Sequence, residues 1–197
     1  PRPLLIGQSR FEPAAFEGVA VTAFAAPDCS YEVFTDTVAG AEREILVNVY
    51  EFTDSKMAED LIRARERGVN VTVLIEGGPV GGISAEGRAV AGALNRSGIP
   101  VLSMTTTDAA HAKYRFDHAK YLVVDGNTVL LGSENFKPDG YPEPGLRGNR
   151  GWGVRLEHPG LAGYFVKVFL HDVAGGDIVP VEGTAAEPGT SWSSTYR

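Results

Sequence analysis

The sequence predicts an α/β fold built on a mixed, largely parallel sheet. Apolar runs with the β-branched and aromatic content of strands alternate with segments of helical periodicity from about Val19 to Val173. The composition, with 43% hydrophobic and 22% charged residues, is typical of globular domains. A chain of 197 residues is long enough to bury one sizeable core. These observations together indicate a single domain in which helices cover a sheet.

The first strand and helix are expected near the start of the chain. Residues 18–24 form an apolar run that is typical of a strand. The segment after it carries Tyr31, Phe34 and Val38 at helical spacing, so these side chains share one face. Asp28 stands just before this segment and is expected to cap the helix.

A strand–helix–strand unit follows. Residues 44–52 have the apolar density of a buried strand, and residues 69–75 form a second such run. Between them, Asp54 or Ser55 is expected to cap a helix that Gly68 ends. This pattern predicts a right-handed crossover and parallel pairing of the two strands.

A glycine-rich loop at residues 77–82 leads into the next helix, which Ser84 is expected to cap. The loop has neither the GK[ST] ending nor the GxGxxG spacing of a phosphate-binding loop, so we interpret it as a flexible turn. A short strand is expected at residues 99–102, and a polar connector at residues 103–114.

The second half of the chain predicts a hairpin and a final strand and helix. Two strands, 119–124 and 128–131, are separated by the sequence Asp-Gly-Asn, which is a strong hairpin signal. A loop rich in Pro, Gly and Arg spans residues 136–150. The last strand is expected at residues 152–156 and the last helix at residues 161–173.

Composition divides the chain into three parts. We expect an N-terminal extension over residues 1–18, the folded domain over residues 19–180, and a linker or disordered tail over residues 181–197, because Gly, Ala, Pro, Ser and Thr dominate from Glu182 onward. The chain starts without Met, which suggests processing or excision from a longer polypeptide.

Charge, cysteine content and hydropathy exclude several classes of protein. A formal net charge of −7 argues against tight, non-specific binding to duplex nucleic acid. The single cysteine, Cys29, has no partner for an internal disulfide. The longest uncharged apolar stretch, residues 18–27, is less than half of the roughly 20 residues that a membrane-spanning helix needs. We therefore expect a soluble domain without signal peptide or membrane span, and its compartment stays open.

The chemistry of the chain is concentrated in the hairpin, where six residues follow the pattern HxKx4Dx6GSxN. They are His118, Lys120, Asp125, Gly132, Ser133 and Asn135. Side chains alternate along a strand, so His118 and Lys120 share one face at the start of the first strand, and Ser133 and Asn135 lie together at the end of the second. Because a hairpin brings these two ends side by side, the pattern predicts that imidazole, ammonium, hydroxyl and amide groups converge.

This set of groups fits a phosphoryl-transfer centre. A neutral imidazole is a nucleophile near pH 7, and Lys120 with the amide of Asn135 can stabilise the oxygens of a pentacoordinate phosphorus. No cluster of His, Cys, Asp or Glu has the spacing of a metal site, so neither a metal nor another cofactor is expected.

The pattern resembles the HKD signature of the phospholipase D superfamily, and the likeness extends from about Val19 to Val173. The resemblance implies an α/β/α sandwich in which His118 forms a phosphohistidine. It also implies that Lys120, Ser133 and Asn135 bind the substrate phosphate, with Ser133 in a supporting role. Asp125 belongs to the signature and is counted with the catalytic residues, although its place at the turn indicates a structural role.

The chain departs from the family pattern at two points. Members often carry a carboxylate after GSxN that orients the histidine, whereas residues 149–154 contain neither Asp nor Glu; Glu51, Glu134 and Glu143 are the alternatives. The family also needs two facing motifs, and this chain has one. His111 begins an imitation of the motif that lacks the aspartate, and we interpret it as a connector residue.

The resemblance therefore implies a metal-independent phosphodiesterase or phosphatidyltransferase, with a phospholipid as the first candidate substrate. Three aromatic residues expected at the site entrance, Phe136, Tyr141 and Trp152, favour a lipid. The second HKD motif would come from a homodimer partner or from a missing half of a longer chain. The alternatives are a homodimeric endonuclease acting on DNA or RNA, which needs a basic groove at Lys137, Arg147 and Arg150, and an inactive pairing module.

Overall fold

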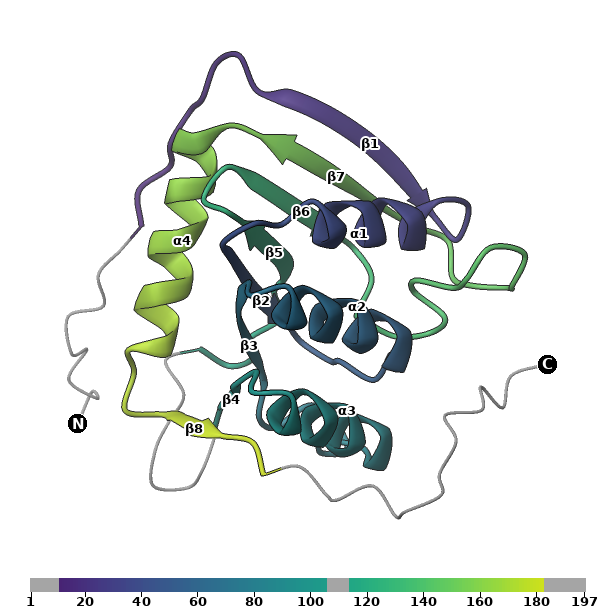
Figure 1. Cartoon of the computed structure of the whole chain (residues 1–197). Coiled ribbons are helices and arrows are strands. Elements are labelled where there is room, and N and C mark those ends of the chain that lie inside the picture. Colours follow the sequence, from purple (N-terminus) through teal and green to yellow (C-terminus); the bar gives the residue numbers. More distant parts are fainter. Residues whose placement is uncertain (1–10, 106–113, 183–197) are drawn as a thin grey trace.

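The computed structural model describes residues 11–105 and 114–182, and an eight-stranded sheet forms its centre (Figure 1). The strands are β1 (Ala20–Ala26), β2 (Glu44–Val49), β3 (Asn70–Glu76), β4 (Val101–Met104), β5 (Lys120–Val124), β6 (Thr128–Gly132), β7 (Gly151–Glu157) and β8 (Ile178–Pro180). The helices are α1 (Ser30–Ala39), α2 (Ser55–Glu66), α3 (Ala85–Arg96) and α4 (Pro159–Val173). The sheet order is β1-β7-β6-β5-β2-β3-β4-β8.

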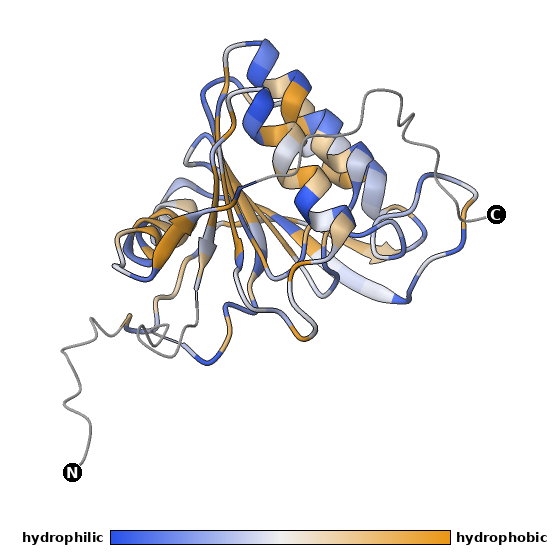
Figure 2. Cartoon of the chain, turned by 90° about the horizontal axis from the view of Figure 1, so that it is seen from below, coloured by the Kyte–Doolittle hydropathy of each residue, from blue (hydrophilic) through white to orange (hydrophobic). Residues whose placement is uncertain are grey.

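Helices cover both faces of this sheet. Helices α1, α2 and α3 lie side by side on one face, and α4 lies alone on the other, which Figure 2 shows with the sheet nearly edge-on. A buried cluster fills each interface, one containing Phe34 and Leu61 under the three helices and one containing Tyr121 and Phe169 under α4. The predicted α/β/α sandwich is therefore confirmed.

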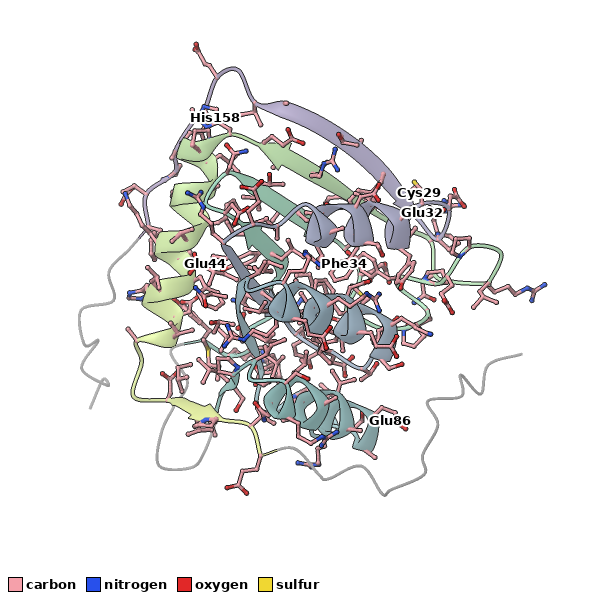
Figure 3. The ribbon with its side chains drawn as sticks, in the orientation of Figure 1. Cys29, Glu32, Phe34, Glu44, Glu86 and His158 are labelled. Atoms are coloured by element: carbon pink, nitrogen blue, oxygen red, sulfur yellow. The ribbon has the colours of Figure 1, made fainter. Side chains whose placement is uncertain are left out.

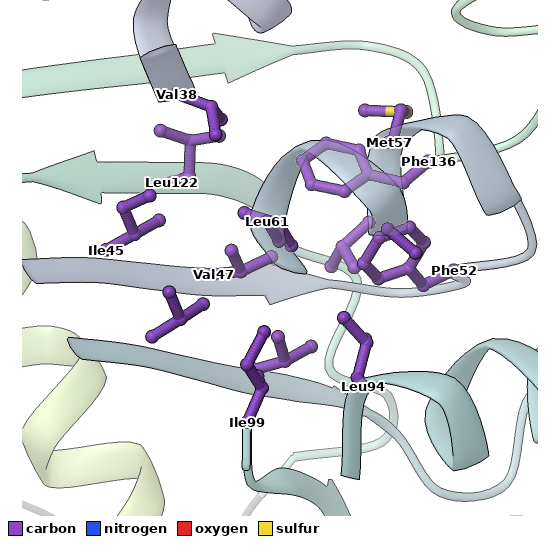
Figure 4. Close-up of a cluster of buried hydrophobic side chains, with 14 of the residues drawn as sticks. Val38, Ile45, Val47, Phe52, Met57, Leu61, Leu94, Ile99, Leu122 and Phe136 are labelled. Atoms are coloured by element: carbon purple, nitrogen blue, oxygen red, sulfur yellow. The ribbon is translucent and has the colours of Figure 1, made fainter. Parts of the chain in front are cut away.

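The larger core forms because apolar side chains recur at strand and helix spacing. Figure 4 shows Ile45 and Val47 of β2 facing Leu61 of α2 and Leu94 of α3, and all four side chains are fully buried. Phe34 lies between α1 and the sheet (Figure 3) and contacts the ring of Phe136 edge-on at 5.4 Å. Burial of side chains of this size contributes about 1.5–3 kcal/mol each to folding.

The expectation of a largely parallel sheet is wrong, although the sheet is mixed as predicted. Only β2–β3 and β3–β4 pair in parallel, as the strand–helix–strand pattern predicts. The other five pairs are antiparallel. The reason is that a tight hairpin forces antiparallel pairing on β5 and β6, and β7 and then β1 extend that half of the sheet in the same manner.

Two of the three predicted helix caps are confirmed. The Asp54 carboxylate accepts hydrogen bonds from the backbone N–H groups of residues 56 and 57, and the Ser84 hydroxyl accepts one from Gly87. The expected cap by Asp28 is wrong. Cys29 holds the cap position because its N–H closes a turn onto the carbonyl of Ala25, and the Asp28 carboxylate pairs instead with Arg150 at 2.8 Å.

Both ends of the described chain join the sandwich. Phe11 contacts α4 through the rings of Tyr164 and His171. The strand β8 pairs antiparallel with β4, and Val181, which the sequence placed in the tail, is buried and donates its N–H to Val101. A three-residue strand ending in Pro180 has too little periodicity to be predicted from sequence.

Candidate active site

The hairpin of β5 and β6 brings the two halves of the motif together. Its register pairs Tyr121 with Leu131 and Val124 with Thr128. Continued past Tyr121, this register sets residues 132–134 opposite residues 118–120. The two strand ends therefore lie side by side as the hairpin predicts. The register sets Ser133 opposite Ala119, and convergence of its hydroxyl and of the Asn135 amide on His118 and Lys120 stays a prediction.

The end of β2 forms the third side of the site. Val49 pairs with Lys120, and the N–H of Tyr50 donates to the carbonyl of Ala119 at 2.9 Å. The chain after β6 is tied to the same segment, because the N–H of Phe136 donates to the carbonyl of Glu51 at 3.1 Å. Residues 50–52 thus lie between the two halves of the motif.

The His118 imidazole is exposed and is bordered by Lys120 and Tyr50. The ammonium nitrogen of Lys120 lies 3.4 Å from each ring nitrogen of His118 and donates to its carbonyl oxygen at 3.2 Å. The Tyr50 ring contacts the imidazole edge-on, with 4.7 Å between centroids. An imidazole and an ammonium group are thereby held side by side at the surface.

The electrostatic environment of Lys120 is set by burial and by three carboxylates. Partial burial lowers the pKa of Lys120 below its ordinary value, while the charges of Glu134, Glu51 and Asp117 raise it in part. Asp117 is itself buried, and burial raises its pKa to about 6, so it is mostly ionised at neutral pH. Lys120 therefore faces more negative than positive charge within this half of the site.

Asn135 lies at the edge of the site with its amide held by Glu51. Its Nδ2 donates to Oε2 of Glu51 at 3.2 Å, and Lys137 Nζ lies 3.3 Å from the same oxygen. An amide nitrogen carries two N–H groups, so Asn135 retains a second donor. Glu51 therefore links the amide predicted to bind phosphate with a second lysine.

Ser133 lies at the junction of β6 and β7 with its hydroxyl already engaged. The hydroxyl donates to Oε1 of Glu134 at 3.2 Å and accepts from the N–H of Trp152 at 3.0 Å. This arrangement agrees with the supporting part of the expectation for Ser133. Any contact of Ser133 with a phosphate would require one of these bonds to be exchanged.

Of the three candidate carboxylates, that of Glu134 packs against residue 151, within the segment 149–154 where the family's carboxylate is missing. A Cβ on Gly151 would overlap its carboxylate, so Glu134 fills the space that a side chain at this position of β7 would take. Glu143 is exposed on the loop that precedes β7. Among the described residues none of the three hydrogen-bonds to His118, and Glu134 and Glu51 act on Lys120 instead.

Asp125 is not brought to the site. It lies seven residues after His118, which at about 3.4 Å per residue of strand is about 24 Å. It lies at the hairpin turn with φ 54°, and its carboxylate accepts the backbone N–H groups of residues 42, 43 and 44 at 2.8–2.9 Å. Its grouping with the catalytic residues is not supported by this position, which fits the structural role that the turn suggests.

Replacing Asp125 with alanine is expected to lower the free energy of unfolding by about 1–3 kcal/mol, because three N–H groups lose their acceptor. The pKa of Asp125 lies below its ordinary 3.8, because these bonds outweigh its partial burial. The folded-state pKa is depressed, so the stabilisation is present above about pH 4 and is lost as the pH falls further. Urea unfolding of the wild type and of Asp125→Ala at pH 7 and pH 3 measures the difference in their free energies of unfolding. An equal difference at both pH values would contradict the prediction.

The expectation of three aromatic residues at the site entrance is wrong in part. Phe136 and Tyr141 do not border the site entrance, because both are fully buried against Phe34 in the larger core. Trp152 is exposed over 65% of its surface, as expected. The proposed basic groove is largely neutralised, because Lys137 pairs with Glu51 and Arg150 with Asp28. His111 lies outside the described residues.

Sequence analysis did not single out Tyr50 or Glu76 as site residues. Tyr50 touches His118, and the buried Glu76 accepts the N–H of Asp117 at 2.6 Å. Their positions in the sequence could have indicated them, because polar residues at the ends of buried strands gather at one sheet edge.

Within residues 11–105 and 114–182, no three His, Cys, Asp or Glu side chains gather in a way that could hold a metal ion. No helix in these ranges is long and apolar enough to cross a membrane.

Comparison with known proteins identifies the family of this chain. Residues 34–173 match the family described as cardiolipin synthase, PLD-like domain. No curated protein matches the sequence. Among solved structures, the phospholipase D family member Nuc from Salmonella typhimurium aligns with a TM-score of 0.70 at 23% identity, over 82% of this chain and 97% of that one.

Two further structures share the fold. NucT from Helicobacter pylori aligns with a TM-score of 0.68 at 14% identity, over 82% of this chain and 99% of that one. The phosphatidylserine synthase of Haemophilus influenzae Rd KW20 aligns with a TM-score of 0.60 at 14% identity, over 84% of this chain but only 40% of that one. With the family match covering well over half of the sequence, the chain belongs to the phospholipase D superfamily, as a PLD-like domain.

Proposed function

We propose that this chain is a phosphodiesterase or phosphatidyltransferase that acts on phospholipids through a phosphohistidine on His118. The observation that carries this proposal is the exposed imidazole with the Lys120 ammonium 3.4 Å from both of its ring nitrogens. Superfamily members are phosphodiesterases or phosphotransferases, and this geometry provides the nucleophile and the cation that such a reaction needs.

In the first step an imidazole nitrogen of His118 attacks phosphorus, a P–N bond forms, and the P–O bond to the leaving alcohol breaks. Lys120 and the free N–H of Asn135 stabilise the negative charge on the equatorial oxygens. In the second step water or an alcohol attacks the phosphohistidine and gives its proton to the group opposite His118 that protonated the leaving oxygen, while the P–N bond breaks and the imidazole is released. Water gives hydrolysis, and an alcohol gives transfer.

The leaving oxygen must receive a proton from a group opposite His118, and one histidine cannot act on both faces of an in-line displacement. Charge supports the same requirement. Lys120 and Lys137 stand among Glu51, Glu134 and the mostly ionised Asp117, so a phosphate anion would meet net negative charge in this half alone. A second HKD motif, from a homodimer partner or from another half of a longer polypeptide, would add the missing acid and cation.

Exposed apolar side chains near the site favour a phospholipid as the substrate. Trp152, next to Ser133, is 65% exposed, and Val80, bonded to Tyr50, is 84% exposed. The ion pairs of Lys137 and Arg150 leave less free positive charge for nucleic acid.

We retain residues 19–180 as the proposed catalytic domain and extend it by one residue to Val181, which packs into the core.

The test is a thin-layer assay of phospholipid products run beside a plasmid-nicking assay, both without added metal. Release or exchange of a phospholipid headgroup is the expected result. Nicking without lipid turnover would show the endonuclease alternative, and the absence of both activities in a chain shown to be dimeric would show an inactive pairing module.

Turnover is expected to survive chelation. Lys120 already brings positive charge to the site, and the nucleophile is an imidazole that needs no metal to activate it. The lipid assay with and without excess EDTA measures this, and the two rates should agree within about twofold. Activity that disappears with EDTA and returns with a divalent cation would contradict the prediction.

The source of the second motif can be measured by mixing. If two copies of this chain complete the site, dimers being the commonest oligomers, sedimentation should give about twice the monomer mass. Mixing wild type with a His118→Ala variant should then lower activity in the proportion expected for heterodimers. A strictly monomeric and inactive chain would support a second half elsewhere in a longer polypeptide, and a fully active monomer would refute both sources.

A further inference from the structure

A buried carboxylate connects the segment that carries His118 with the glycine-rich loop at residues 77–82. Glu76, the last residue of β3, is only 1% exposed. Its Oε2 accepts the backbone N–H of Asp117 at 2.6 Å, and its Oε1 accepts the N–H of Gly78 at 2.8 Å. Both oxygens of one carboxylate are therefore bound to backbone groups 39 residues apart in sequence, at positions 78 and 117.

Tyr50 makes a second connection between the same two segments. Its ring contacts the His118 imidazole, and its hydroxyl accepts the N–H of Val80 at 3.0 Å. The two connections close a ring that runs from Glu76 to Asp117 and His118, through Tyr50 to Val80, and back along the loop.

The loop itself is anchored where it leaves the sheet. The N–H of Gly77 donates to the carbonyl of Met104 at 2.7 Å, and a Cβ at this glycine would lie 2.5 Å from that carbonyl oxygen. Only glycine allows this close approach. Beyond it, Pro79 lines a narrow cleft together with Tyr50, Glu51 and Glu76, so the loop lies against the segment whose Tyr50 ring contacts His118.

We infer that Glu76 is a positioning residue for His118, which fixes the imidazole relative to Lys120 by tying its backbone to the 77–82 loop. This inference rests on the proposed role of His118 as the nucleophile. Catalysis depends on a reacting group being held close to its productive geometry, and a displacement of about 1 Å can cost about a hundredfold in rate. Glu76 touches neither the imidazole nor Lys120, and its effect passes through the backbone of Asp117.

The variant Glu76→Gln tests this role with little change of shape. A glutamine has one oxygen and one NH2 group, so it can accept from only one of the two N–H groups and sets a donor against the other. We expect kcat to fall by about 10- to 100-fold with KM changed less than about threefold, because binding groups stay in place while the nucleophile is misplaced.

The matched control is Asp60→Asn, which also converts a buried carboxylate into an amide. Asp60 is 5% exposed on α2, where it accepts from the hydroxyl of Thr35 at 3.1 Å and pairs with Arg63, away from the site. It should lower the melting temperature as Glu76→Gln does but leave kcat within about twofold. An equal loss of kcat in both variants would mean that Glu76 acts through stability alone.

Tyr50→Phe opens the ring at its other link, because it removes the hydroxyl that binds Val80 and keeps the aromatic contact with His118. It also serves if Glu76→Gln does not fold. If either variant alone breaks the ring, the second substitution has little left to disrupt. The double variant Glu76→Gln, Tyr50→Phe should therefore lose less activity than the product of the two single losses. Independent, multiplicative losses would overturn the inference.

Histidine side-chain NMR separates this inference from the proposed function, because it needs no turnover. The signal of His118 is identified by its loss in His118→Ala, and it should shift in Glu76→Gln and in Tyr50→Phe, while that of His158, the cap of α4, stays in place. An unchanged His118 signal in both variants overturns the inference even if the chain is active. The expected shifts in a chain that is dimeric but lacks phosphodiesterase activity would refute the proposed function and leave the coupling of the loop to His118 established.

Discussion

Replacing His118 with alanine is expected to reduce phospholipid turnover to background. No other described side chain offers an exposed imidazole beside a lysine ammonium, since Lys120 Nζ lies 3.4 Å from both ring nitrogens of His118. The two remaining described histidines belong to α4, where His158 caps the helix and His171 contacts Phe11. Without the nucleophile there is no covalent intermediate, and the reaction loses the path that divides it into two steps.

The measurement is the initial rate of phospholipid turnover, with acid quenching to trap the intermediate. Labelled phosphate should be found on His118 in the wild-type chain. His111→Ala is the control and should retain nearly full activity, because the motif around His111 lacks the aspartate of the signature. Equal losses in the two variants would show that the motif begins at His111, and phosphate trapped on any other residue would refute the mechanism.

Replacing Lys120 with alanine is expected to lower kcat by about a hundredfold or more, the usual effect of removing a group that stabilises transition-state charge. The side chain is half-buried beside the nucleophile, and no water can take its place with an equivalent positive charge. Stability should change little by comparison, so thermal unfolding of the variant separates a catalytic loss from a folding defect.

The pH dependence of the wild-type enzyme provides an independent measurement of Lys120. Burial holds the pKa of Lys120 below its ordinary 10.5, so activity should fall on the alkaline side as the ammonium loses its proton. Glu134, Glu51 and Asp117 oppose this shift, and the variant Glu134→Gln removes one of the three charges. Its alkaline limb should therefore move to lower pH. A limb that stays in place, or moves upward, would show that another group controls it.

Features that depend on neighbours along the chain could be predicted from sequence alone. The caps by Asp54 and Ser84 and the βαβ unit depend on short segments, and all are observed. The pairing of the two motif strands belongs to the same class, because strand alternation and the Asp-Gly turn determine which residues of a hairpin lie side by side. Convergence of the Ser133 and Asn135 side chains on His118 and Lys120 stays a prediction.

Features that depend on contacts between distant segments could not be predicted from the sequence alone. Phe136 and Tyr141 follow the motif and were expected at the surface, yet both are buried because Phe34, about 100 residues earlier, packs against them. The endonuclease alternative needs Lys137 in a basic groove, and the pairing of Lys137 with Glu51 depends on β2 lying beside the hairpin.

The sequence by itself determined the class of fold, the motif and the nucleophile it predicts, because each follows from residue type and local spacing. Only the tertiary structure decided the balance of parallel and antiparallel pairs, the removal of Asp125 from the site, and the link from Glu76 to the backbone of Asp117. The physical reason is that local periodicity shows which face a side chain takes, whereas a partner from another strand is fixed only when packing brings the two chain segments within hydrogen-bonding distance.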